Sequence, residues 1–112
     1  MVKTLKITKD DLSFDNFYKG KIDASYFDGD IEIDGGLGML KFWGGLVASG
    51  KIVVGKYTGI YACYTIRSGR DITLSCGDIE VNGNIVVGGN LKVHGLVKAS
   101  EYIKVGGISR IT

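Results

Sequence analysis

A six-residue phrase repeats without interruption through the C-terminal part of this chain, and it restricts the folds that the chain can adopt. From residue 78 to residue 107 the sequence divides into DIEVNG, NIVVGG, NLKVHG, LVKASE and YIKVGG. The second and fourth residues of every hexad are apolar. Because side chains alternate between the two faces of a β-strand, each hexad predicts a short strand with these two positions on one face.

Two apolar columns therefore run through the hexads. The second position contributes Ile79, Ile85, Leu91, Val97 and Ile103. The fourth position contributes Val81, Val87, Val93, Ala99 and Val105. The other positions carry mostly polar residues and glycine, such as Asp78, Glu80 and Lys98, and we expect them to be solvated.

The repeat predicts a parallel β-solenoid. The pattern never reverses and its corners are short, and self-similarity at a fixed short period is typical of strands that stack one coil on the next. Three sides of six residues give a triangular coil of about 18 residues, which places Glu80 over Lys98. The 18 glycines suit tight corners, and the absence of proline suits unbroken hydrogen-bond ladders. A small β-sandwich or barrel is the alternative, although its turn signals recur at about eight to twelve residues.

The same phrase returns upstream in a looser form, which predicts an all-β, single-domain β-helix of about four coils between residues 22 and 108. It is seen in DGDIEIDGG (28–36), GKIVVG (50–55) and RDITLSCG (70–77). An aliphatic residue recurs about one coil apart at Ile31, Ile52, Ile72 and Leu91. The longer segments 36–45 and 56–69 are expected to bulge out or to widen one side.

The two ends differ in pattern. Residues 3–27 do not follow the phrase. Val2, Leu5 and Ile7 alternate loosely, and Thr8 followed by Asp11 resembles a helix start. We expect residues 1–21 to cap the first coil, with a short helix or turn that brings Leu12, Phe14, Phe17 and Tyr18 over it. Residues 22–112 are expected to form the solenoid.

The C-terminal segment stops within the repeat, and an uncovered sheet edge tends to pair with another chain. We therefore expect self-association there, as a closed dimer or a filament; a frayed last strand is the alternative. The expected self-association residues are Ile103, Val105, Ile108, Arg110 and Ile111.

Charge and composition narrow the function classes. The net charge is +2, with hydrophobic residues at 45% and charged residues at 23%, which is typical of a globular domain. Lysines and aspartates are interspersed, so there is no basic stripe for nucleic acid. No apolar run resembles a secretory signal or a membrane span, and we expect a cytoplasmic location.

Catalytic and metal-binding patterns are not found, so we expect a non-enzymatic protein without cofactor or metal. His94 is the only histidine and is expected at a surface turn. Asp30, Glu32 and Asp34 alternate on one strand face, which favours a solvated surface over a Ca²⁺ site. Cys63 and Cys76 lack the spacing of a metal or redox motif, which favours two small buried thiols over a disulfide.

The aromatic residues offer a candidate binding patch. Phe42 and Trp43 are adjacent and must point to opposite faces, so one of them is outside. If Ile60 and Ala62 face inward, Tyr61 faces outward. We therefore expect Trp43, Tyr57 and Tyr61 to form a patch for a glycan or a protein partner, with coverage of an irregular coil as the alternative.

Two resemblances add expectations. GDIEVNGNIVVGGNLKVHGLVKAS resembles the bactofilins, polymer-forming bacterial proteins; the likeness covers residues 77–107 well and 29–55 partly. It implies a right-handed triangular β-helix that self-associates through its end coils. VNGNIVVGGN is also similar to the hexapeptide-repeat acyltransferases, which implies a trimer with a histidine base, here His94.

We thus expect a structural protein that assembles through its solenoid ends. The alternatives are a small phage- or mobile-element-encoded protein that binds a host or bacterial protein or forms part of a fibre, and, less favoured, an acyltransferase-like enzyme.

Overall fold

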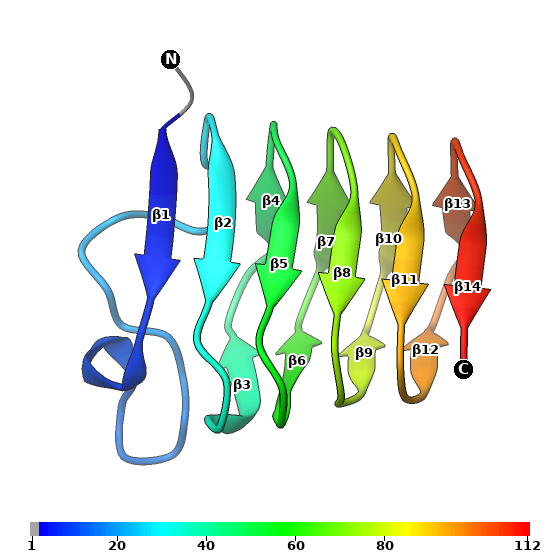
Figure 1. The fold of residues 1–112 in the computed structure, drawn as a ribbon. Coiled ribbons are helices and arrows are strands. Elements are labelled where there is room, and N and C mark those ends of the chain that lie inside the picture. Colours follow the sequence, from blue (N-terminus) through cyan, green and yellow to red (C-terminus); the bar gives the residue numbers. More distant parts are fainter. Residues whose placement is uncertain (1–2) are drawn as a thin grey trace.

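The computed structural model describes residues 3–112 and consists almost entirely of β-structure, with 49% strand and 3% helix. Short parallel strands stack into a β-solenoid of about four turns (Figure 1). The predicted fold class is therefore confirmed. Val2, which the sequence placed in the N-terminal segment, lies outside the described residues.

Three parallel sheets form the sides of the solenoid. Sheet 1 contains β1 (Thr4–Ile7), β2 (Asp30–Ile33), β5 (Ile52–Val54), β8 (Ile72–Leu74), β11 (Leu91–Val93) and β14 (Ser109–Ile111). Sheet 2 contains β3 (Gly38–Phe42), β6 (Thr58–Ala62), β9 (Ile79–Val81) and β12 (Val97–Ala99). Sheet 3 contains β4 (Leu46–Ala48), β7 (Thr65–Ser68), β10 (Asn84–Val87) and β13 (Ile103–Val105).

The coil is right-handed. In Figure 1 the chain runs down the near strands of sheet 1 and returns upward through sheets 2 and 3 on the far side, while it advances from the N-terminal to the C-terminal end. Parallel strands joined by a crossover in one sheet take this hand almost without exception.

The coils shorten along the chain. In sheet 1, Ile31 pairs with Ile52, Ile52 with Ile72, Ile72 with Leu91 and Leu91 with Ser109, so successive coils take 21, 20, 19 and 18 residues. The predicted column of aliphatic residues is therefore confirmed in full. Strands β3 and β6 have five residues each, against three in β9 and β12, so the long upstream segments widen sheet 2.

The core consists of the inward-facing columns of the three sheets. The predicted inner residues of β9, β10 and β11 are at most 1% exposed. Phe42 occupies the column of Ala62 and Val81 and contacts Tyr18, the two ring centres lying 5.5 Å apart. The large ring thus fills the space beneath the N-terminal segment, where no further coil is stacked.

The N-terminal segment begins as a strand of the solenoid and then covers its end. Strand β1 pairs in parallel with β2, so Leu5 and Ile7 are buried. A 3₁₀ helix, Lys9–Asp11, follows. Thr8 is its N-cap, and the Thr8 N–H donates to Asp11 Oδ2 at 2.9 Å in a capping box, as the sequence indicated.

Residues 12–28 then lie across the N-terminal edges of sheets 2 and 3. The N–H of Tyr18 donates to the carbonyl of Lys41, and the N–H of Lys41 donates to the carbonyl of Asn16. Phe27 bonds in the same way to Val47 in β4 and to Ser49, the residue after β4. Leu12, Phe17 and Tyr18 are half-buried there, but Phe14, which the sequence placed over the coil, is fully exposed. Both edges are therefore occupied by backbone partners.

Polar side chains at the corners connect successive coils. Asp78 Oδ1 accepts from the N–H of Leu96 at 3.0 Å, and Asn90 Oδ1 accepts from the N–H of Ile108 at 2.9 Å. Asp71 bonds in the same way to Asn90. Asp78 and Asn90 are exposed, as the sequence predicted. Their side-chain oxygens also accept hydrogen bonds from backbone N–H groups that have no backbone acceptor at these corners.

The register of the last coils follows the sequence prediction. Lys98 pairs with Glu80, and both side chains are exposed on the outer surface of sheet 2. An exposed pair of this kind contributes about 0.2–1 kcal/mol.

Candidate functional site: the C-terminal face of the solenoid

Strands β12, β13 and β14 form the C-terminal edge of all three sheets. Each of them pairs with only one neighbouring strand, respectively β9, β10 and β11. Within residues 3–112, no segment lies beyond them (Figure 1). Each strand therefore presents unpaired N–H and carbonyl groups, which form a template for pairing with another strand. We call these three strands, with the corner residue that precedes each of them, the C-terminal face.

The inward-facing side chains of this face are only partly covered. Val97 and Ala99 in β12 and Val105 in β13 are half-buried, whereas Ile103 and Ile111 are exposed. Their equivalents one coil earlier are at most 1% exposed. The columns of the core thus continue to the surface at this end, because no further coil is stacked on them.

The corner residues of the last coil are apolar where the preceding coil has polar ones. The equivalent residues one coil earlier are Asp78 before β9, Asn84 at the start of β10 and Asn90 before β11. The residues before β12, β13 and β14 are Leu96, Tyr102 and Ile108, with exposed fractions of 73%, 52% and 63%. Since Asp78 and Asn90 bond to the coil stacked on them, the change removes two hydrogen-bonding corners. It exposes three large apolar side chains instead.

The outward-facing centre of every edge strand is basic. These residues are Lys98 in β12, Lys104 in β13 and Arg110 in β14, and all three are exposed. One coil earlier the same positions are Glu80, Val86 and Lys92. The C-terminal face therefore consists of an apolar centre and apolar corners surrounded by three cationic groups.

The structure brings all five predicted self-association residues together on this face. Ile103 and Val105 lie in β13, Arg110 and Ile111 lie in β14, and Ile108 is the corner residue between them. Sequence reasoning did not identify Leu96, Tyr102, Lys98 and Lys104. The signal was present in the hexads, because the first residue changes from Asp or Asn to Leu, Tyr or Ile in the last coil.

The predicted aromatic residues do not lie side by side. Strands β3 and β6 are parallel neighbours in sheet 2. Trp43 follows the C-terminal end of β3, whereas Tyr57 precedes the N-terminal end of β6. They are 70% and 68% exposed. Tyr61 lies between them in β6 and is half-buried, and its hydroxyl accepts from Asn82 Nδ2 at 2.9 Å. Inward Phe42, Ile60 and Ala62 confirm the predicted facing of these strands.

Trp43 has a different aromatic neighbour, Phe17 of the N-terminal segment. The two rings are stacked with centres 4.1 Å apart and planes within 7°, and Lys41 Nζ lies 5.3 Å from the centre of the Phe17 ring. An open hollow of about 330 Å³ beside Trp43 is also lined by Tyr18, Asp23 and Ser25.

Three titratable groups of the N-terminal segment have shifted pKa values. Burial raises the pKa of Tyr18, and the nearby carboxylates of Asp11 and Asp23 raise it further. Hydrogen bonds from Ser13 and Ser25 hold the pKa of Asp15 and Asp23, respectively, below the usual range. The two aspartates are fully exposed, so their ionisation has little bearing on stability.

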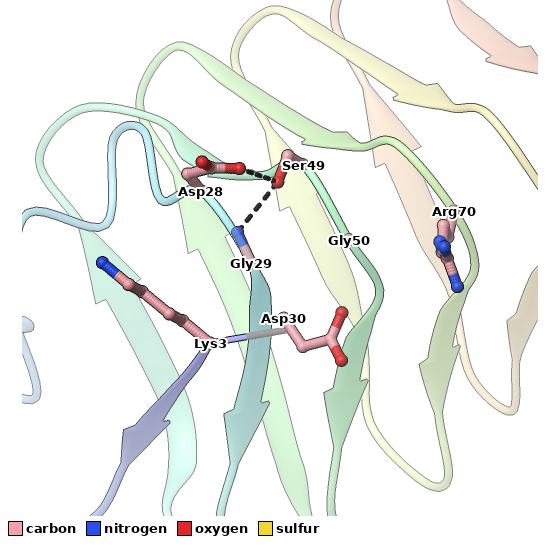
Figure 2. Close-up of a pocket in the computed structure, with 7 residues that line it drawn as sticks. All are labelled: Lys3, Asp28, Gly29, Asp30, Ser49, Gly50 and Arg70. Carbon is pink, nitrogen blue, oxygen red and sulfur yellow. Dashed lines mark hydrogen bonds between the residues drawn. The ribbon is translucent and has the colours of Figure 1, made fainter. Parts of the chain in front are cut away.

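A second hollow, of about 260 Å³, lies at the corner that leads from sheet 3 into sheet 1 (Figure 2). Ser49 Oγ donates to Asp28 Oδ1 and accepts from the N–H of Gly29, each at 2.8 Å. Lys3 and Arg70 lie on opposite sides of this hollow. Its polar groups are mainly engaged in joining coils, since Asp30 Oδ1 accepts from the N–H of Lys51 at 2.9 Å.

The remaining candidate residues are dispersed. His94 is exposed at a corner, as predicted, with Nδ1 3.0 Å from Thr112 Oγ1. Cys63 and Cys76 are free and half-buried, whereas the sequence predicted full burial; each lies at a corner, which is open to solvent on its outer side. Glu32 and Asp34 are exposed beside Asp30.

Residues 3–112 contain no group of three His, Cys, Asp or Glu side chains placed to hold a metal ion. In the same part of the chain no helix is both long enough and apolar enough to cross a membrane.

Within residues 3–112 the fold is thus that of a right-handed parallel β-solenoid in which the N-terminal segment covers the edges of sheets 2 and 3 and no strand is stacked on the C-terminal face. Comparison with known proteins adds no relative, because no family model, no curated protein and no solved structure matches the chain.

Proposed function

We propose that this protein is a non-enzymatic structural protein that associates end to end through the C-terminal face. The observation that carries the proposal is the change in the last coil, where polar corners become Leu96, Tyr102 and Ile108 beside partly uncovered core columns. Contiguous exposed apolar groups of this kind are typical of interaction surfaces, and the unpaired edges supply backbone groups for strand addition. The resemblance to the bactofilins supports the same function.

The proposed partner is a second copy, related by a two-fold axis, rather than the next member of a filament. A filament also requires contacts at the N-terminal end of the solenoid. There residues 16–27 hydrogen-bond to the edges of β3 and β4, so that within residues 3–112 only β1 keeps a free N-terminal edge. Two C-terminal faces have no such obstruction and give a closed assembly.

The basic residues weaken this dimer at low salt. In a two-fold dimer each edge strand of one copy lies opposite an edge strand of the other copy. Because the central outward residue of all three strands is basic, every such contact places two basic residues opposite each other. Like charges directly opposite each other in paired strands are destabilising. Because the three side chains are exposed, the repulsion is screened when the Debye length falls from about 10 Å at 0.1 M salt to about 3 Å at 1 M.

We expect the mass measured by light scattering after size-exclusion chromatography to rise from 12.0 kDa toward twice that value with increasing protein concentration. The rise should begin at a lower protein concentration in about 1 M salt than in about 0.1 M salt, because the higher salt screens the repulsion between the basic residues. Ile111→Lys and Ile108→Lys should remain monomeric, because each places a charge in the apolar part of the contact.

Thr73→Lys is the matched control. Thr73 faces outward in β8, in the same row as Arg110 but away from both ends, so this variant should dimerise like the parent. A mass that continues to grow beyond the dimer would contradict the two-fold arrangement. A monomer at every concentration and salt would contradict the proposed function.

A second candidate function is binding of a partner protein at Trp43, and the stacked Phe17–Trp43 pair favours it. Holding an exposed indole against a second ring lowers the entropy cost of burying it in an interface. The partner could be a host or bacterial protein, as expected for a small phage- or mobile-element-encoded binder.

This second function predicts that a protein captured by the parent chain, once identified and purified, changes the fluorescence of Trp43, the only tryptophan. Trp43→Phe should weaken its binding, measured by calorimetry, by about tenfold or more, as for truncation of an aromatic anchor. Tyr64→Phe, at another exposed ring, should bind like the parent. Equal affinity of the Trp43 variant and the parent would exclude this site.

A further inference from the structure

The charges of the C-terminal face are arranged as a repeated pattern. Each edge strand has three residues, with one outward side chain at its centre and inward side chains on both sides: Val97–Lys98–Ala99, Ile103–Lys104–Val105 and Ser109–Arg110–Ile111. The three outward residues lie on the three different sides of the solenoid. A strand added to any edge therefore meets a cation at its centre.

The pairing of β12 with β9 shows one arrangement of charges that fits against such a strand, whereas the residues beneath Lys104 and Arg110 are Val86 and Lys92. Below β12 lies β9, in which Glu80 stands between Ile79 and Val81, and Glu80 is in register with Lys98. The acidic centre thus lies beside the basic one while the aliphatic residues on both sides continue the core columns. Opposite charges directly across a strand pair stabilise it, and like charges destabilise it.

We infer that the C-terminal face, besides pairing with a second copy of this chain, binds an acidic protein partner more tightly, one whose edge strands carry a carboxylate at their centre between aliphatic residues. The inference rests on the proposed function, since it uses the same face and the same strand addition. The acidic partner makes three attractive contacts where a second copy makes three repulsive ones.

A copy with reversed charges on the face supplies a partner of matching shape. In the variant Lys98→Glu, Lys104→Glu and Arg110→Glu, all three changes are at exposed positions, and its fold is checked by circular dichroism. We expect the parent and this variant to form a mixed dimer at least about tenfold more tightly than either forms its own dimer, because three contacts change sign. Fluorescence anisotropy of a labelled copy measures the three dissociation constants.

A second variant carries the same change in net charge away from the face. Lys56→Glu, Arg67→Glu and Arg70→Glu replace exposed basic residues of the second coil. This control should show no preference for the parent chain. If the triple face variant does not fold, the single variant Arg110→Glu takes its place and should show a smaller preference of the same sign.

The salt dependence of the two dissociation constants distinguishes the mixed dimer from the dimer of the parent chain. The mixed dimer should weaken as salt rises from about 0.1 M to 1 M, whereas the dimer of the parent chain should strengthen. Equal affinity of mixed and parent dimers, with the parent dimer still formed, would overturn the charge selection alone. An absence of association in every combination would overturn the proposed function as well.

Discussion

Replacing Ile60 by alanine is expected to lower the free energy of unfolding by about 2–5 kcal/mol. Ile60 is fully buried in β6, and its column continues to Leu40 in β3 and Ile79 in β9. Coils stack on both sides of it, so the neighbouring backbone is held by two ladders and cannot collapse into the space. The loss therefore includes both the transfer of the removed carbons and the cavity left behind.

Urea unfolding followed by circular dichroism measures this loss. Ile60→Val should cost only about 0.5–1.5 kcal/mol, because it removes one methylene group. Val86→Ala, at a half-buried outward position in β10, should cost less than Ile60→Ala, because solvent fills the vacated space. If Val86→Ala destabilised the protein more than Ile60→Ala does, the inner columns could not be the main source of stability.

Replacing Gly83 by alanine is expected to destabilise the protein by about 1–3 kcal/mol or more, as overpacking does in other cores. Gly83 is buried at the corner between β9 and β10, and a Cβ atom there would overlap the carbonyl oxygen of Tyr64 in the coil below. The backbone must shift to relieve this overlap. The shift would strain the bond from the N–H of Glu101 to the carbonyl of Gly83, now 3.0 Å long, in the coil above.

Gly44→Ala is the matched control for this steric effect. Gly44 also lies at a corner, but the nearest atom to an added Cβ is the Cβ of Ser25 at 3.8 Å, an ordinary contact. We expect a change within about 0.5 kcal/mol for this substitution. Thermal unfolding of the two variants compares them directly. Equal melting temperatures would show that the corners yield freely and that the close stacking of coils is not required.

The short-range periodicity of the sequence was sufficient to predict the fold class. Alternation with a period of two residues selects strands, and a six-residue repeat with glycine corners selects parallel coils over hairpins. The same local logic predicted the column from Ile31 to Leu91, the opposite facing of Phe42 and Trp43 and the Thr8 capping box, all of which the structure confirms. These features depend only on residues near one another in the chain.

Other features depend on which coil lies above or below and were not accessible in this way. The widening of sheet 2 by the five-residue strands β3 and β6 appears only when strands are paired. The pairing also places Trp43 and Tyr57 at opposite ends of neighbouring strands. The path of the N-terminal segment places Phe17 beside Trp43. Side chains of one coil acquire neighbours from other coils only after the register is fixed.

The C-terminal face shows where the two kinds of information meet. The sequence by itself determined that the last hexads have apolar residues at alternate positions. Only the tertiary structure decided that Leu96, Tyr102 and Ile108 occupy the three corners of one coil, and that Lys98, Lys104 and Arg110 occupy its three sides. The physical reason is that a hexad specifies one strand and one corner, whereas a face exists only when three hexads close into a triangle.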